Sequence, residues 1–230
     1  MSPSVPTPAH TTSADPSVQP ARDSRYGFVA AWVILGLTVV QLAVAAIASS
    51  SSAVELEQFE GKAFGARLIA YPLLMLLLPA CWWTARRRRG GEAASAPLPW
   101  TAFAWIMLPF LVDVTGNSLD LYDSVSWWDD ANHLFNWFFL CLGLGLLLAR
   151  ADVRPHWVLG LSIAGLGAIL AIGWELAEWY TFIRHGTELD TAYVDTLGDL
   201  TLGTLGSLTA ALLLLRHRRL ARSARGTATP

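Results

Sequence analysis

Charge is what this sequence has least of. Only 15% of its 230 residues are charged and 53% are hydrophobic, whereas about 25% of the residues in a typical soluble domain are charged. This shortage argues against an ordinary soluble domain and indicates a membrane protein. The eleven Trp residues fit the same interpretation, because Trp concentrates where a membrane meets water.

Lysine, cysteine and the common catalytic motifs are also scarce or missing. Lys62 is the single lysine, and both cysteines, Cys81 and Cys141, fall inside apolar segments, where burial as small apolar side chains is expected. The phosphate-binding glycine loop, the GxSxG turn and the HExxH zinc helix are absent, which excludes the enzyme classes that they define. The run Arg86–Arg89 is typical of a topology anchor, so nucleic acid is not an expected partner.

What remains predicts an all-α, single-domain bundle of six transmembrane helices. A span needs about 20 apolar residues, and six segments come close to or meet this length. They are 26–49, 68–84, 98–115, 132–149, 157–180 and 197–215, within a membrane domain at 25–215. Residues 1–24 are rich in Pro, Ser and Thr and predict a disordered tail, and residues 216–230 form a basic cytoplasmic tail.

The placement of arginine predicts the orientation of these spans. If the N-terminus is cytoplasmic, 13 of the 16 basic residues fall on the cytoplasmic side, as the positive-inside rule requires. We therefore expect a multi-pass protein of the inner cell membrane with both termini in the cytoplasm. The acidic residues follow the opposite pattern, with 14 of 18 on or near the outer face, and Arg184 is the only fixed basic counter-charge expected among those between 113 and 199.

Ionisable residues gather at the outer ends of spans four, five and six. Residues three or four apart share one face of a helix, so donor groups from three helices are expected to converge there. We expect a glutamate carboxylate of this cluster within about 8 Å of His133 or Asp199, a distance that a shared ion or one water layer can bridge. The candidate functional residues are Asp129, Asp130, His133, Glu175, Glu178, Asp195 and Asp199.

Helix capping is an alternative to a functional role for four of these acids and does not explain the others. Asp129, Asp130, Asp195 and Asp199 occupy first helical turns or caps, where the helix dipole favours negative charge. Glu175 and Glu178 lie near the end of a span, where the dipole disfavours anions, and Asp113 shares that position in span three.

Adjacent buried carboxylates require a neutralising partner. The alternatives are a divalent cation, protons, a cationic ligand held by nearby aromatic residues, or Arg184 and the histidines folding back. Mg²⁺, Ca²⁺ and Mn²⁺ suit carboxylate oxygen, and the histidine favours Mn²⁺ or Zn²⁺. The candidate metal ligands are His133, Glu175, Glu178, Asp195 and Asp199.

Small residues predict that spans four to six pack closely. Gly160, Ala164 and Ala168 recur every four residues, as do Gly167 and Ala171, and Gly203 and Ser207 repeat this spacing in span six. Such residues allow helix backbones to approach one another in membranes.

Three segments carry a family resemblance. The Asp-rich loop with His133, the sequence WELAEW at 174–179 and the sequence DTLGD at 195–199 together resemble the YjdF-like bacterial inner-membrane proteins, and more distantly the VanZ-like family. The resemblance implies a multi-pass protein whose motif positions are His133, Glu175, Glu178, Asp195 and Asp199. The VanZ-like proteins add a link to the cell envelope and to glycopeptide resistance. This chain departs from the pattern at Gly198, where the family usually has Trp.

Three functions fit these observations. The first is a membrane protein with an outward-facing acidic site that binds a metal ion or a polar, lipid-linked envelope ligand, with or without enzymatic activity. The second is a small proton-coupled transporter that uses Glu175 and Glu178, although spans four to six carry no acid closer to the cytoplasm. The third is a structural membrane protein. The oligomeric state stays open.

Overall fold

The described part of the chain is helical throughout. A computed structural model describes residues 25–50, 62–91, 97–151, 153–181, 183–185, 189 and 191–226, and in these ranges it contains no strand. The long helices are α1 (Arg25–Ser50), α2 (Phe64–Arg89), α4 (Trp100–Ser118), α6 (Trp128–Leu148), α7 (His156–Thr181) and α8 (Ala192–Gly226). A single turn, α5 (Leu121–Ser124), joins α4 to α6. The expected tail at 1–24 lies outside the described residues.

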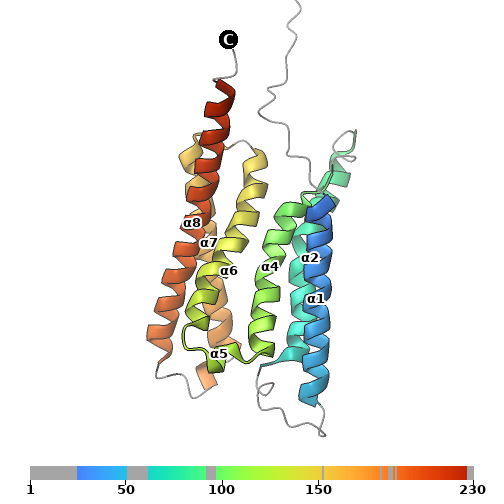
Figure 1. Cartoon of the computed structure of the whole chain (residues 1–230), viewed down its shortest axis with the longest axis vertical. Coiled ribbons are helices and arrows are strands. Elements are labelled where there is room, and N and C mark those ends of the chain that lie inside the picture. Colours follow the sequence, from blue (N-terminus) through green and yellow to red (C-terminus); the bar gives the residue numbers. More distant parts are fainter. Residues whose placement is uncertain are drawn as a thin grey trace, which may run out of the picture.

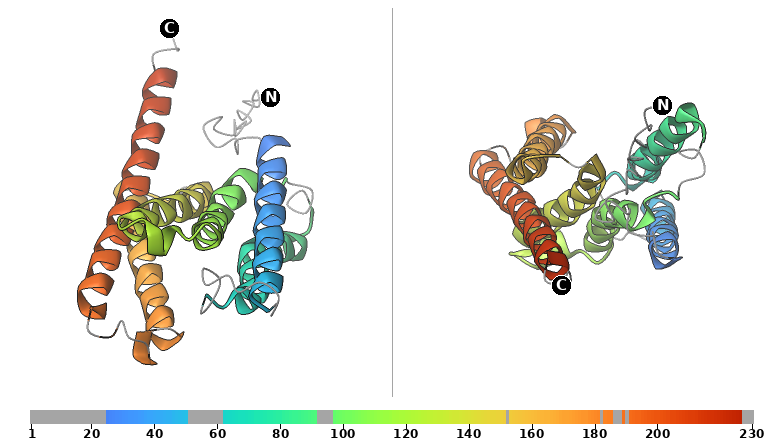
Figure 2. Two further views of the ribbon diagram at one scale, coloured as in Figure 1. Left: turned by 60° about the horizontal axis from the view of Figure 1, so that its bottom comes forward. Right: turned by 90° about the horizontal axis from the view of Figure 1, so that it is seen from above.

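The long helices form one bundle with two halves. Neighbouring helices alternate in direction, so the start of α1 and the end of α8 lie at the same end of the bundle (Figure 1). Helices α1, α2 and α4 pack together, as do α6, α7 and α8. Contact between α4 and α6 joins the halves, and these two helices lie in the middle when the bundle is seen from above (Figure 2).

Five of the six expected spans are confirmed as helices that are long and apolar enough to cross a membrane. They are α1, α2, α7, the stretch Trp128–Ala151 that contains α6, and Ala192–Ala221 of α8. The third expected span coincides with α4, which is not among them. The reason is the polar C-terminal part of α4, where Asp113, Thr115 and Asn117 make hydrogen bonds inside the bundle.

Apolar side chains cover the outside of the bundle as well as its core. Leu73 and Ile169 are 66% and 67% exposed, which fits helices that face lipid. Inside the N-terminal half, Met75 of α2 packs with Phe103 and Met107 of α4. The outward apolar surface and the apolar core together are typical of a membrane bundle.

Close helix packing in the C-terminal half is confirmed. A Cβ atom on Gly167 of α7 would overlap the side chain of Ser207 of α8 and lie against Cys141 of α6, while Gly203 faces the ring of Trp137. The Cys141 Sγ and Ser207 Oγ atoms are 3.2 Å apart in a buried hydrogen bond. The middle parts of α6, α7 and α8 therefore pack closely here because the side chains between them are small.

Candidate functional site

His133 lies at the centre of the expected acidic cluster. It belongs to the second turn of α6 and its side chain is 9% exposed. Its Nε2 atom is 3.7 Å from Asp129 Oδ1 and 3.6 Å from Asp199 Oδ1, and its Nδ1 atom is 3.8 Å from Glu175 Oε1. The prediction that these groups from three helices meet within about 8 Å is confirmed.

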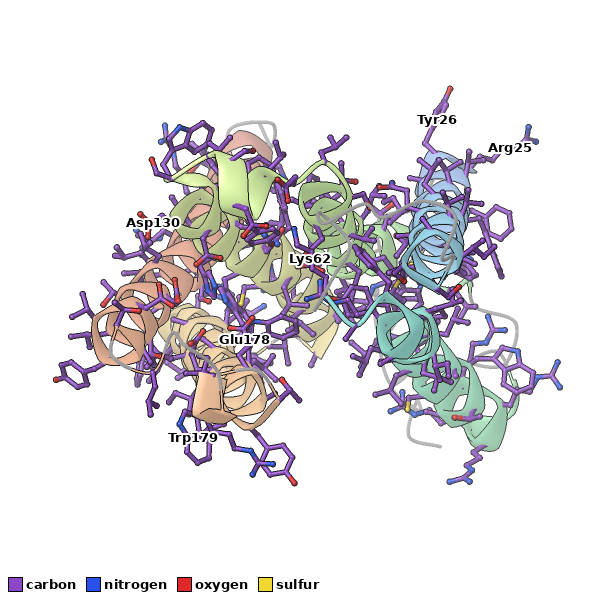
Figure 3. The ribbon with its side chains drawn as sticks, turned by 90° about the horizontal axis from the view of Figure 1, so that it is seen from below. Arg25, Tyr26, Lys62, Asp130, Glu178 and Trp179 are labelled. Atoms are coloured by element: carbon purple, nitrogen blue, oxygen red, sulfur yellow. The ribbon has the colours of Figure 1, made fainter. Side chains whose placement is uncertain are left out.

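Two sets of possible ligand atoms share this imidazole ring. One comprises Asp129, His133 and Asp199, the other His133, Glu175 and Glu178, and in each set the ligand atoms lie within 4.8 Å of one another. Glu178 is half-buried and points from α7 toward the middle of the outer end (Figure 3).

Two of the candidate residues lie apart from both sets. Asp130 and Asp195 are exposed, and Asp130 lies at the outside of the bundle in Figure 3. The Asp195 carboxyl precedes Asp199 by one helical turn and so lies further out along α8. Its role as a metal ligand stays a prediction.

The cluster around His133 lacks internal neutralisation. Nδ1 of His133 is buried without a hydrogen-bond partner, and separations of 3.6–3.8 Å are too long for hydrogen bonds. Glu175, Glu178 and Asp199 form no ion pair with an arginine or lysine in the described part of the chain. Thr196 provides one hydrogen bond to Glu175. The cluster is therefore rich in acceptors and negative charge and poor in donors.

A second buried carboxylate, Asp113 of α4, is fully paired. Its Oδ2 atom accepts hydrogen bonds from Arg67 Nη1 at 3.0 Å and from the Tyr71 hydroxyl at 2.5 Å. Its Oδ1 atom accepts from Asn117 Nδ2 at 3.2 Å and from the Tyr122 hydroxyl at 3.0 Å. Donors from α2, α4 and α5 thus surround this one acid.

The expectation that Arg184 is the only fixed basic counter-charge was wrong. Arg67 pairs with Asp113, and Lys62 pairs with Asp120 and Asp123 at 2.9 and 2.6 Å. Arg184 instead lies over the Tyr180 ring, 3.7 Å from its centre. Lys62 and Arg67 flank the start of α2, outside the stretch 113–199, and α2 begins at the end of the bundle where α4 finishes.

The Asp113 pairing continues toward α6 through residues that the sequence pattern did not single out. Tyr122 lies outside the spans, and burial together with the neighbouring Asp113 charge raises its pKa well above its ordinary value, so its hydroxyl keeps the proton that it donates. The same oxygen accepts from Asn132 Nδ2, and Asn132 Oδ1 accepts from Asn136 Nδ2. Asn132 directly precedes His133. A polar side chain inside an apolar span is the sequence feature that could have indicated its role.

Comparison with known proteins places the chain. Residues 30–220 match the model of a family described as "Predicted membrane protein (DUF2238)". The chain belongs to this family. The matched range in DUF2238 contains every residue of both clusters, and it supports the resemblance to the YjdF-like proteins. No curated protein and no solved structure matches the chain.

Proposed function

We propose that this DUF2238 membrane protein binds a divalent cation through His133 Nδ1, Glu175 and Glu178. The carrying observation is the Nδ1 atom, which is buried, has no hydrogen-bond partner and faces the Glu175 carboxylate. A buried polar atom without a partner is costly, and adjacent buried carboxylates repel each other. One cation removes both costs.

The distances suit ligands of one ion. Two atoms that each lie about 2.0–2.2 Å from an ion are at most about 4.4 Å apart, and this limit grows to about 5 Å for the longer bonds of Ca²⁺. Nδ1 and Glu175 Oε1, at 3.8 Å, lie inside both limits, and the 4.8 Å bound on the whole set lies inside the longer one. One nitrogen with carboxylate oxygens is a donor set that favours Mn²⁺ or Zn²⁺ over Mg²⁺.

The two aspartates at the other edge of the ring take an orienting role. A histidine that ligates a metal through one nitrogen usually directs the N–H of the other toward a carboxylate. Asp129 and Asp199 lie at the Nε2 edge. Asp129 is in the first turn of α6, where the helix dipole favours its charge, whereas α8 begins at Ala192, so Asp199 is not in the first turn, where the sequence predicted it. Glu175 and Glu178 lie near the C-terminal end of α7, where the helix dipole disfavours their charge and a cation would offset it.

The site opens at the outer face in the six-span topology. Helix α4 crosses as the third span although its hydropathy is lower, because its polar atoms bond inside the bundle. Both termini are then cytoplasmic, in the inner membrane, and the cation lies at outer-leaflet depth. A polar or lipid-linked envelope molecule is the ligand class that reaches this depth, and the distant VanZ-like resemblance agrees with it.

Reporter fusions after Arg89 and Arg225 test the topology, and a periplasmic signal from either overturns it.

The cation is tested on the purified full-length protein by metal analysis and thermal unfolding with Mn²⁺ or Zn²⁺. Wild type is expected to bind one ion per chain and to melt at a higher temperature when the ion is bound. At a free ion concentration of 100 times Kd, binding adds about 2.7 kcal/mol to the free energy of unfolding. Glu175→Gln and Glu178→Gln are expected to fold and to lose both effects. Asp130→Asn, a neighbouring acid outside both sets, is the matched control and keeps them. Wild type without a bound ion or a thermal shift would overturn the proposal.

A further inference from the structure

A chain of hydrogen bonds crosses the outer end of the bundle from one half to the other. It begins at Arg67 of α2, passes through Asp113 of α4 and Tyr122 of α5, and ends at Asn132 of α6. Asn132 is 6% exposed, so its amide bonds are shielded from competing water. Every link is a directional bond between side chains from different helices.

The last link adjoins the candidate cation site. Asn132 and His133 are consecutive, so their side chains leave α6 about 100° apart. Asn132 faces Tyr122, while His133 faces Glu175 of α7 and Asp199 of α8. Rotation of α6 that moves one of these side chains must move the other.

We propose that Tyr122 and Asn132 are positioning residues through which the N-terminal half sets the rotation of α6 and thereby the direction of the His133 ring. This inference rests on the proposed function for its effect on cation binding, but the rotation itself does not depend on a cation. The hydroxyl of Tyr122 is the decisive group, since it donates to Asp113 and accepts from Asn132. Replacing it with hydrogen removes both bonds and keeps the ring.

The contact between α4 and α6 at this end is built for close approach. A Cβ atom on Gly116 of α4 would overlap the Trp128 indole and crowd the Tyr122 ring. Only glycine therefore leaves space for both aromatic side chains beside the hydrogen-bond chain. The close fit limits how far the start of α6 can turn while Tyr122 stays in place.

The inner parts of the same two helices are held by different forces. Gly143 of α6 packs against the Ala102 carbonyl of α4, and the rings of Trp105 and Phe139 stack with centres 5.6 Å apart. These contacts contain no member of the hydrogen-bond chain. Breaking the chain is therefore expected to change the rotation of the outer part of α6 without separating the halves.

The cation-binding test uses Tyr122→Phe and Asn132→Ala in the full-length protein, with the exposed Tyr193→Phe as matched control. Both variants are expected to lose up to about 10-fold in Mn²⁺ affinity, at or below the effect of removing a direct partner of a ligating histidine, because they act on His133 only through the rotation of α6. The visible absorption spectrum of bound Co²⁺ is expected to change in the same variants, which a general loss of stability would not produce. Tyr193→Phe keeps the wild-type affinity and spectrum.

The rotation is tested separately, without a cation. Spin labels at Phe135→Cys on α6 and Leu176→Cys on α7, in a Cys81→Ala background, replace exposed side chains. Their distance distribution is expected to shift or broaden in Tyr122→Phe. A shift together with a wild type that binds no cation would support the positioning role and overturn the cation site. Unchanged label distances, or unchanged Mn²⁺ affinity and Co²⁺ spectrum in both variants, would overturn the positioning role.

Discussion

Asp113 and Glu175 occupy comparable positions in their helices, but the rest of the chain supplies many more hydrogen-bond and charge partners to Asp113 than to Glu175. Each is a buried or largely buried carboxylate near the outer end of its helix, α4 or α7, where the helix dipole disfavours its charge. Asp113 receives four side-chain hydrogen bonds, one of them from Arg67. Glu175 has a hydrogen bond from Thr196 and the His133 imidazole at 3.8 Å.

This difference separates a structural acid from a candidate binding acid. The chain itself supplies the positive charge and the donors that Asp113 needs, so that residue holds three helices together. Around Glu175 the acceptors outnumber the donors, and the nearest buried nitrogen has no partner. Buried charge persists only where it is paired or coordinated, and in our proposal the partner of the second cluster is the cation.

The largest loss in the free energy of unfolding is expected from Asp113→Leu. This change leaves the mostly buried Arg67 guanidinium without its carboxylate, and breaking a buried ion pair at one partner typically costs about 3–5 kcal/mol. Unfolding of the purified protein in mild detergent measures the loss. The double variant Arg67→Leu with Asp113→Leu is expected to recover most of it, because no unpaired charge remains. A loss below about 1 kcal/mol in Asp113→Leu would contradict a structural role for this acid.

A smaller effect is expected from Gly206→Ala, which tests what holds the other cluster in place. The new Cβ would overlap the backbone carbonyl of Leu134 in α6, and overpacking of this kind typically costs about 1–3 kcal/mol. Gly165→Ala of α7 is the control, since no atom lies within 4 Å of its Cβ position. Equal stability of the two variants would show that close packing does not hold α6 and α8 together at this point.

Without a cation, Glu178→Gln is expected to stabilise the protein by about 1 kcal/mol. The Glu178 carboxylate is repelled by that of Glu175. Two unit charges about 5 Å apart repel by about 3 kcal/mol at an effective dielectric constant of 20, and protonation relieves part of this repulsion. The corresponding change in the paired cluster, Asp113→Asn, is expected to destabilise. If both changes shift the free energy of unfolding in the same direction, the contrast between the clusters fails.

The spacing of residues along the sequence was sufficient to predict the features that depend on a single helix. It placed five spans, brought Asp129 and His133 onto one face of α6, and indicated the close packing that Gly167 and Ser207 now show. The meeting of the His133 cluster was also predictable, because helices of alternating direction place the start of α6, the end of α7 and the start of α8 at the same end of the bundle.

Pairings between helices could not be predicted in the same way. Whether Arg67 meets Asp113 depends on the rotation and height of α2 against α4, which neither helix determines alone. The same limit applies to Asn132 and Tyr122. Asp195 and Asp199 share a helix face, yet only Asp199 is buried, because burial depends on where the neighbouring helices end.

The smallest effect is expected at the surface, where Lys62 pairs with Asp120 and Asp123. Burial lowers the pKa of Lys62, but its hydrogen bonds to Asp123 and Asp120 outweigh this and leave the pKa above its ordinary 10.5. The hydrogen bond from Lys62 lowers the pKa of Asp120 below its ordinary 3.8. Ion pairs that are partly open to solvent, as these are, contribute little and are screened by salt, so Lys62→Met is expected to lower Tm only slightly, and less at high salt.

The pH dependence of Lys62→Met shows to which cluster this lysine belongs. A raised lysine pKa contributes stability that is complete below 10.5 and is lost as pH rises through the folded-state value. A lowered aspartate pKa contributes stability that is present above 3.8 and is lost as pH falls through the folded-state value. The difference in Tm between wild type and Lys62→Met is therefore expected to stay constant from about pH 5 to pH 9. A difference that changes inside this window would mean that Lys62 interacts with a group titrating there, and would link the surface pair to the histidine cluster rather than to Asp120 and Asp123.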